Sequence, residues 1–223
     1  MPTRQFKECS VEEARQIQQD LLVKEVIQGL TKNQIGGRYV RTRHEAAEMI
    51  LSMIPAGAKV GFGGSLTLDE SGIKDTLRKG DFCFIERNIP GLTPEQVFHL
   101  RRETLLCDIF LCSTNAITKD GKLVNIDGIG NRIAALTFGP RKVIVVAGVN
   151  KIVKDVEHAL ERLREHAAPL NARRRGDNTP CVRTGICSDC RSPDRICCIT
   201  TIISFQHDKD RMTVILVGED LGL

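Results

Sequence analysis

The sequence contains no tryptophan, and tyrosine occurs only once in 223 residues. Proteins that bind single-stranded nucleic acid stack its bases on aromatic side chains placed among basic ones. No such mixture is present here, and the net charge of +4 is mild. The one basic run, Arg173-Arg174-Arg175, is typical of a solvated loop. We therefore expect no nucleic-acid partner.

Long apolar runs are also missing. The opening residues Met1–Ser10 hold no hydrophobic segment that could act as a secretory signal. No later run approaches the roughly 20 apolar residues that cross a bilayer. These absences predict a cytoplasmic protein without membrane insertion. With 41% hydrophobic and 27% charged residues, the chain can bury a sizeable core.

Cysteine is abundant instead, and five of the nine cysteines lie between Cys181 and Cys198. Their spacing is C-x5-C-x2-C-x6-C with one more cysteine adjoining, and the C-x2-C step lets two thiolates reach one metal from a single turn. Four sulfur ligands suit either zinc or an iron–sulfur cluster, and ligand type alone does not choose between them. Disulfides are not expected, because the cytosol keeps thiols reduced. The other cysteines stand singly and are expected to be small core residues: Cys9, Cys83, Cys107 and Cys112.

Helix and strand signals alternate along the chain, as in an α/β domain. Capping residues begin helices at Ser10, Thr42 and Thr93. The clearest buried strand is Lys142–Ala147, after which Asn150 is expected to cap a helix that continues up to Pro169. Further expected elements are a first helix ending near Gly36-Gly37, strands over 59–62 and 81–85, a helix over 68–78 and an apolar run over 107–112.

Two hairpins and a division of the chain complete the expected architecture. The turn Lys119–Lys122 joins strands over 116–118 and 123–126. Segments 199–205 and 212–217 together predict a terminal hairpin. We expect residues 1–55 to form a helical segment packed on an α/β domain over 56–223. That domain includes the cysteine segment, 181–198.

Three polar loops stand at strand ends, where open α/β sheets usually bind ligands. In the first, Gly61-Phe62-Gly63-Gly64-Ser65, closely spaced glycines let backbone N–H groups converge on a phosphate or carboxylate. This loop matches neither the dinucleotide fingerprint nor the P-loop. Its alternative role is a tight turn needed only for packing.

The second loop is Ser113-Thr114-Asn115-Ala116, and the third runs from Asn125 to Arg132. In the third loop Asp127 can act as an acid, a base or a charge partner. The alternative is an Asp-Gly turn followed by an Asn helix cap. The candidate ligand-binding residues are Gly61, Gly63, Gly64, Ser65, Thr114, Asn115, Asn125, Gly128 and Asn131, and the candidate catalytic residues are Asp127 and Glu70.

Several of these segments resemble the LUD domain, the family of lactate utilisation protein C. The resemblance lies in 61–68, 113–118, 121–132 and 138–151, and 184–197 is similar to the tail of a compact branch of the family. It spans nearly the whole chain from the second helix onward. It implies a Rossmann-like three-layer α/β/α fold akin to the NagB/RpiA/CoA-transferase group. Relatives in that group bind sugar phosphates, CoA esters or folates at strand ends.

The resemblance also implies an association with oxidation of L-lactate to pyruvate, beside an iron–sulfur partner and an oxidoreductase subunit. Lactate utilisation protein C is not defined by a cysteine tail, so the tail suggests a redox centre carried by this branch. Neighbouring side chains of a strand point to opposite faces, so only one of Cys197 and Cys198 is expected to reach the centre. The resemblance favours Cys197. The expected ligands are Cys181, Cys187, Cys190 and Cys197.

The leading hypothesis is a redox-linked protein of the lactate-utilisation type with a [4Fe-4S] cluster, a small-molecule anion as ligand and a ferredoxin-type electron-transfer partner. A second hypothesis is an isomerase or transferase for sugar phosphates or CoA esters. It would use Asp127 or Glu70 as its acid/base residue, with the cysteines holding a structural zinc. A third is a sensor or assembly subunit without catalysis. The oligomeric state is left open.

Overall fold

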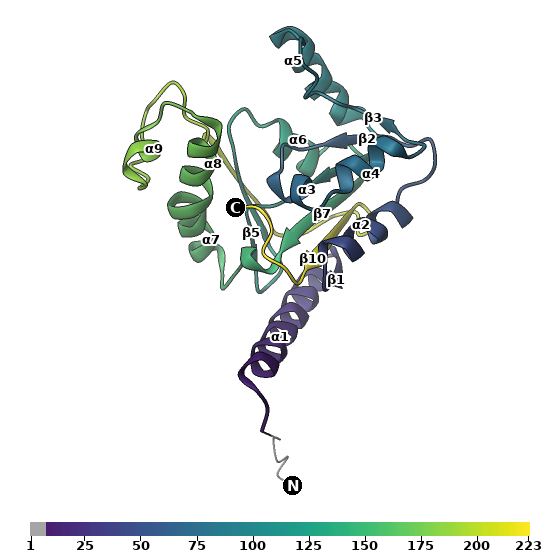
Figure 1. The fold of residues 1–223 in the computed structure, drawn as a ribbon, viewed down its shortest axis with the longest axis vertical. Helices are drawn as coiled ribbons and strands as arrows, with labels where there is room; N and C mark the ends of the chain where they lie inside the picture. Colours follow the sequence, from purple (N-terminus) through teal and green to yellow (C-terminus); the bar gives the residue numbers. More distant parts are fainter. Residues whose placement is uncertain (1–7) are drawn as a thin grey trace.

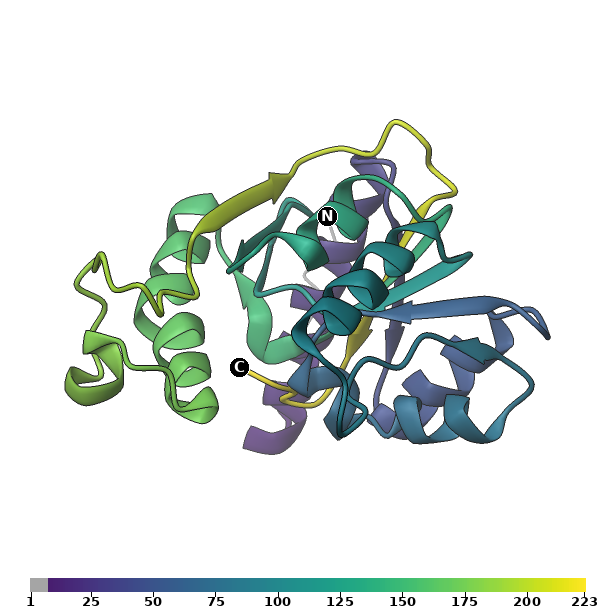
Figure 2. The ribbon, with the colours of Figure 1, turned by 90° about the horizontal axis from the view of Figure 1, so that it is seen from above.

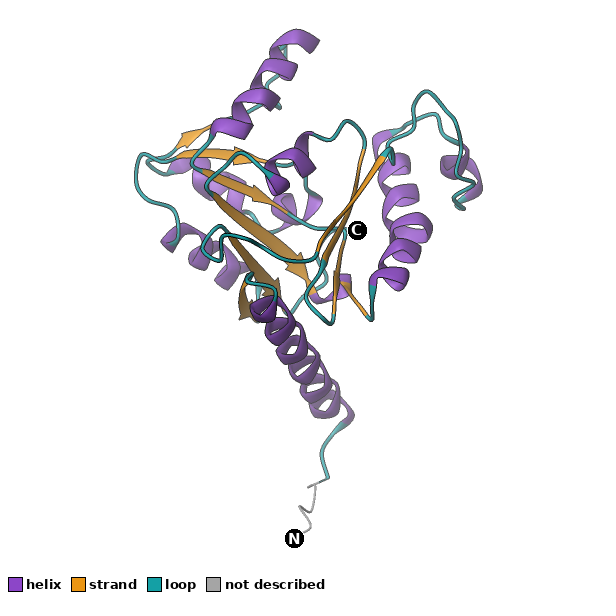
Figure 3. Ribbon diagram, turned by 180° about the vertical axis from the view of Figure 1, so that it is seen from behind, coloured by secondary structure: helices purple, strands orange, loops and turns teal. Residues whose placement is uncertain are grey.

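The computed structural model describes residues 8–223. Residues 1–7, part of the opening stretch in which no secretory signal is expected, lie outside the described residues. A parallel sheet dominates the described chain (Figures 1 and 3). Its six strands lie in the order β1 (Gly36–Val40), β10 (Met212–Val217), β7 (Lys142–Gly148), β4 (Ile109–Cys112), β2 (Lys59–Phe62) and β3 (Cys83–Phe84).

Helices cover both faces of this sheet. Along β7, Val143 and Val145 pack on one face, and Ile144 and Val146 pack on the other. Such a continuous apolar run is what a strand buried on both faces requires. The three-layer α/β/α architecture is therefore confirmed. The first face is covered by α1 (Val11–Lys32) and α6 (Asn131–Thr137), and the second by α2 (Arg43–Ser52), α3 (Leu66–Glu70) and α4 (Ile73–Lys79).

A second, smaller sheet lies beside the first. Its order is β8 (Ile152–Val153), β5 (Ala116–Thr118), β6 (Leu123–Asp127) and β9 (Ile199–Ile203). Strands β5 and β6 are antiparallel, which confirms the hairpin predicted around Lys119–Lys122. One face of this sheet joins the main core through Ile117 and Leu123, and the other packs on α7 (Val156–Arg162).

The remaining helices lie at two extremities of the molecule. Helix α5 (Pro94–Glu103) projects from the edge that carries β3, and none of its residues is fully buried (Figure 1). At the opposite end, α7 leads through a π-helical turn, Leu163–Ala167, into α8 (Ala168–Arg175) and α9 (Pro180–Thr184) (Figure 2). The cysteine segment follows there, so it lies at one end of the molecule. Within the described residues, no helix combines the length and apolar character needed to cross a membrane.

The predicted terminal hairpin is wrong, because its two strands belong to different sheets. Strand β9 pairs antiparallel with β6, whereas β10 lies between β1 and β7 in the main sheet. The physical reason is visible in β10, whose Val214 and Leu216 are buried on one face and Ile215 and Val217 on the other. An edge hairpin would leave one of these apolar faces in water.

The N-terminal third also departs from the expectation. Helix α1 ends at Lys32, before the predicted end near Gly36-Gly37, and Gly36–Val40 forms the strand β1. Residues 1–55 thus contribute a strand to the main sheet as well as helices. The helix expected over 68–78 is divided at Gly72, which has a φ of 69°. The strand expected over 81–85 shrinks to Cys83–Phe84.

Helix capping was predictable except after β7. The caps at Ser10, Thr42 and Thr93 are confirmed as capping boxes. Asn150, however, lies in a 3₁₀ turn, and Asp155 caps α7 by accepting from the His158 backbone. The helical path does not end at Pro169 either. It passes through the π-helical turn Leu163–Ala167, and Pro169 lies in the first turn of α8, where a missing backbone N–H is tolerated. The basic run 173–175 therefore forms the exposed end of α8, not a loop.

Candidate functional site

The strand order of the main sheet changes direction between the neighbouring strands β2 and β4. From β2 the chain goes outward to β3, and from β4 it continues to β7 and β10 on the other side. Because β2 and β4 are parallel, the loops that follow them leave the same edge of the sheet. The chain then turns toward β3 after β2 and toward β7 after β4. Open α/β sheets bind ligands at such a point. The structure brings the first and second predicted loops together at this edge.

The glycines of the first loop have different surroundings. A Cβ atom on Gly61, which lies within β2, would meet Thr104 at 2.7 Å and Cys107 at 2.9 Å, so packing alone requires this glycine. Gly63 is buried against the side chain of Arg132. Gly64 is exposed, and a Cβ there would stand 3.1 Å from Nη2 of Arg87. Only Gly64 of these three is open to a ligand.

Ser65 and Thr114 serve the local fold. The Ser65 hydroxyl accepts from the Leu68 backbone and so caps α3. The Thr114 hydroxyl is buried and donates to the carbonyls of Ala116 and Val124. Both hydroxyls are thus engaged within the polypeptide.

Arg132 connects the second and third loops. Its guanidinium donates to the Ser113 carbonyl at 3.0 Å, to Asn125 Oδ1 at 2.5 Å and to Asn115 Oδ1 at 3.0 Å. Its Nε lies 3.3 Å from Asp127 Oδ2, with both side chains 11% exposed. Asn115 also accepts from the Ile126 backbone. The polar side chains predicted from separate loops therefore form one hydrogen-bonded unit.

The two candidate catalytic carboxylates are already occupied. Asp127 pairs with Arg132 and accepts from the Gly130 backbone. Glu70 is exposed, and its carboxylate accepts from the Gly222 backbone at 2.7 Å. Asp127 is placed at the site as a charge partner, whereas Glu70 holds the C-terminal residues against α3.

Lys151 is the main residue of this edge that sequence reasoning missed. It follows β7, is 3% exposed, and donates to Thr67 Oγ1 at 2.7 Å and Ser113 Oγ at 2.8 Å. Burial, and then the charges of Arg162 and Arg132, lower the pKa of Lys151 to about 7. A lysine with such a pKa is an effective acid or base near neutral pH. Its position directly after the clearest strand was the available signal.

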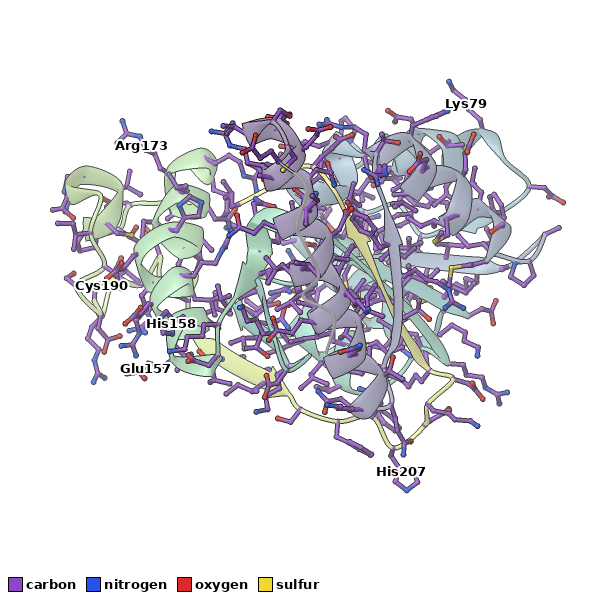
Figure 4. The ribbon with its side chains drawn as sticks, turned by 90° about the horizontal axis from the view of Figure 1, so that it is seen from below. Lys79, Glu157, His158, Arg173, Cys190 and His207 are labelled. Carbon is purple, nitrogen blue, oxygen red and sulfur yellow. The ribbon has the colours of Figure 1, made fainter. Side chains whose placement is uncertain are left out.

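The four predicted cysteine ligands line one narrow cavity of about 20 Å³. The rest of its wall combines three small or apolar residues of α8, which are Ala168, Pro169 and Ala172, with Thr179, Ser188, Arg195 and Ile196. Cys198 is exposed and does not line the cavity. The labelled Cys190 marks this end of the molecule, opposite Lys79 (Figure 4). The cysteines that line the cavity are Cys181, Cys187, Cys190 and Cys197.

A cavity of this size has room for about one water-sized body and excludes an organic substrate. Within residues 8–223, no three His, Cys, Asp or Glu side chains stand close enough to hold a single metal ion. The chemistry of the wall nevertheless fits a thiophilic centre, because four thiols line it and no carboxylate or imidazole does. The assignment of these four cysteines as ligands stays a prediction.

Arg195 holds the cysteine segment in its path. Its guanidinium donates to the carbonyls of Cys190 and Cys197 and pairs with Asp189 at 2.8 Å. Burial is the largest influence on the Cys197 thiol and raises its pKa, while the charge of Arg195 opposes this. The neighbouring Cys187 and Cys190 add to the rise.

The cysteine segment directly touches the third polar loop. The Cys198 backbone N–H donates to the Asp127 carbonyl at 2.9 Å. A Cβ on Gly128 would stand 3.5 Å from the Ile196 carbonyl. The cysteine cavity and the sheet edge are therefore joined through main-chain contacts.

The isolated cysteines divide into two classes. Cys107 and Cys112 are buried, as predicted, and burial raises their pKa values to about 11 and about 12. Cys9 and Cys83 are exposed, so the prediction of core positions for them is wrong. Cys83 lies in the edge strand β3, where one face is open to solvent, and Cys9 precedes the first helix.

Solved structures of other proteins are similar to this chain, and the first of them agrees with this architecture. The first structure compared is the crystal structure of a DUF162 family protein from Deinococcus radiodurans, with a TM-score of 0.53 and 15% identity over 89% of this chain and 98% of that one. The tetrameric eIF2B-beta2-delta2 complex from C. thermophilum matches with a TM-score of 0.41 and 15% identity, over 92% of this chain and 61% of that one. No curated protein matches the sequence.

The sequence itself matches a family over most of its length. The match runs from residue 23 to residue 217, and so includes both sheets, the three polar loops and the cysteine segment. The chain belongs to the LUD domain family.

Proposed function

We propose that this LUD-domain protein binds a small carboxylate or phosphate anion at the sheet edge between β2 and β4, and holds a redox centre in the cysteine cavity. The contact between the Cys198 backbone and the Asp127 carbonyl carries this proposal, because it joins the two regions. A centre at the cavity would then lie beside the loop that contains Asp127.

A [4Fe-4S] cluster is the centre that we propose, with Cys181, Cys187, Cys190 and Cys197 as its ligands. The donor set of four thiols is the one that such clusters use, and zinc is the alternative. When bound, the cluster would supply one-electron transfer. The chain's part is to hold the ligands through Arg195 and to keep the sheet edge rigid through Arg132.

The family relationship suggests the ligands and partners to test first. The resemblance to lactate utilisation protein C makes L-lactate and pyruvate the first carboxylates, and a ferredoxin-type protein the first electron partner. Positive charge at the sheet edge supports an anion as ligand, since Lys151, Arg132 and Arg87 all stand there.

Anaerobic purification tests the redox centre. We expect a brown protein with broad absorbance near ~400 nm that bleaches on reduction. Cys190→Ser should lose most of the iron and sulfide, while Cys198→Ser, the matched control outside the cavity, should retain both. A colourless protein with one equivalent of zinc would contradict the redox part of the proposal.

One observation favours a second candidate, a non-redox isomerase or transferase. Lys151 is buried beside two hydroxyls and has a pKa of about 7, which suits acid/base catalysis better than the occupied Asp127. Acetyl-CoA and ribose 5-phosphate are suitable probes of the two substrate classes. Turnover that survives Cys190→Ser but is lost in Lys151→Met would support this candidate. Ligand binding without turnover would instead support a sensor or assembly subunit.

A further inference from the structure

Strand β9 forms an open edge of the second sheet. It pairs with β6 on one side, and in the described sheets no strand follows it on the other. The yellow-green ribbon of β9 lies at the rim of the molecule (Figure 2). The remaining sheet edges are blunted, because β3 and β8 have two residues each and β1 carries the exposed Arg38. Strand β9 has five residues and no such protection.

The sequence of β9 and of the residues after it is neutral and largely apolar. From Ile199 to Gln206 it contains no charged residue, no proline and no glycine, although 27% of the whole chain is charged. The side chains of Ile199, Ile202 and Phe205 are 41%, 42% and 56% exposed. An exposed strand of this composition pairs readily with another strand. Within residues 8–223 the chain supplies no further strand for it.

The backbone of β9 turns two residues outward. In β6, the residues opposite Thr200 and Ile202 are Ile126 and Val124. The Ile126 N–H donates to Asn115 Oδ1, and the Val124 carbonyl accepts from a hydroxyl on the β5 side. Both of these β6 residues thus direct their backbone groups away from β9. Because successive pairs of an antiparallel ladder alternate in direction, Thr200 and Ile202 direct their N–H and C=O groups to the free edge.

We propose that β9 pairs with the β9 strand of a second copy of this chain and forms a symmetric dimer. An antiparallel pairing centred on Thr201 places Thr200 opposite Ile202 of the other copy. The outward N–H and C=O groups of these two residues then exchange hydrogen bonds, and symmetry repeats the exchange on the other side of the centre. The two Thr201 side chains meet at the position without hydrogen bonds, where Cα atoms are about 4.5 Å apart.

The neutral character of β9 favours an identical partner. Like charges directly opposite each other destabilise a strand pair, and this segment brings none to the centre of the interface. A symmetric pair also uses each edge once, so the assembly closes as a dimer. The exposed Ile129 extends the apolar contact, because a Cβ on its neighbour Gly130 would stand 3.1 Å from Ile199 Cδ1. This dimer is independent of the anion site and of the redox centre.

Sedimentation velocity of the anaerobically purified full chain tests the pairing. We expect a dimer that dissociates on dilution. Thr200→Pro removes an N–H that points away from β6, so it should keep the fold and weaken dimerisation by at least about tenfold. Ile202→Lys should weaken it in the same way, because a lysine on an edge strand opposes pairing. Leu21→Lys is the matched control, since Leu21 is 63% exposed on α1 and its replacement should leave the dimer unchanged.

Amide exchange followed by NMR locates the interface directly. The N–H groups of Thr200 and Ile202 should exchange slowly in the dimer and rapidly after dilution. A monomer at every concentration, or a dimer in which these amides exchange rapidly, would overturn the pairing. So would a dimer that Leu21→Lys dissociates and Ile202→Lys leaves intact, because the contact would then lie on α1. Should circular dichroism show that Thr200→Pro is unfolded, Ile202→Lys and the wild-type exchange rates still decide the question.

Discussion

The sheet edge and the cysteine segment differ in how their polar groups are held. At the edge, Arg132 alone donates four hydrogen bonds to the second and third polar loops and pairs with Asp127, and Lys151 is buried against two hydroxyls. In the cysteine segment, Arg195 donates hydrogen bonds to two backbone carbonyls and pairs with Asp189, whose side chain is 73% exposed. The edge is built into the core, whereas the segment lies outside it.

This difference indicates which interactions keep each region ordered. The edge is preorganised by the packing of two sheets, so it needs no ligand to keep its geometry. The cysteine segment has few apolar contacts and many exposed residues, which is typical of a region that a bound metal stabilises. We therefore expect changes at the edge to affect global stability, and changes in the segment to affect local order.

The largest effect is expected from Arg132→Met. Asp127 would lose its partner while only 11% exposed, and such an uncompensated charge costs about 3–5 kcal/mol. Urea unfolding followed by circular dichroism measures this loss. Arg195→Gln is the matched control at the exposed pair, where a loss of at most about 1 kcal/mol is expected. Equal losses for the two variants would remove the contrast between the regions.

Lys151 predicts a pH-dependent stability. Its pKa is about 7 in the folded protein and 10.5 in the unfolded chain, so between these values the unfolded state binds more protons. The free energy of unfolding should therefore rise with pH across this window, by up to roughly 1.4 kcal/mol per pH unit from this group. Below pH 7 the group adds no slope. Unfolding titrations of the wild type and Lys151→Met should differ by this slope, and parallel curves would contradict the buried charge.

Metal removal should act on the cysteine segment alone. After treatment with ferricyanide and EDTA, we expect trypsin to cleave after Arg183 and Arg191, both of which are exposed. The metal-loaded protein should resist cleavage there, because bound metal orders the segment. The thermal midpoint of the main domain should change little. A collapse of that midpoint on metal removal would show that the segment supports the core.

The smallest effect on stability is expected from Cys198→Ser, and thiol labelling checks the exposure of the cysteines. In the native protein Cys107 and Cys112 should not react with Ellman's reagent, because they are buried and burial raises their pKa values. Cys9, Cys83 and Cys198 are exposed and should react. Cys198→Ser should remove one reactive thiol and change stability by less than about 0.5 kcal/mol. Labelling of Cys112 in the folded state would contradict its burial.

Local signals in the sequence were reliable guides to the fold. The capping boxes at Ser10, Thr42 and Thr93 and the turn at Lys119–Lys122 each depend on residues within about four positions. The failures came from long-range pairing. The partners of β9 and β10, and the existence of β1, depend on strands more than 60 residues away.

The candidate site was predicted in the same uneven way. The polar loops and the cysteine group were visible as composition, and the structure brings members of each together. Arg87 and Lys151 were missed, because a lone basic residue in sequence gives no sign of burial. Glu70 was predicted near the site from its proximity in sequence; its charge acts on Lys151, and its carboxylate accepts from the Gly222 backbone.

The sequence by itself determined the helix starts, the hairpin of the second sheet, the α/β class and the grouping of cysteines, because each follows from neighbours along the chain. Only the tertiary structure decided that β2 and β4 diverge beside Arg87, that Arg132 joins the polar loops, and that the cysteine segment meets the Asp127 loop. The physical reason is that burial and charge pairing arise between residues distant in sequence. These pairings decide which polar groups are satisfied within the protein and which are left for a ligand.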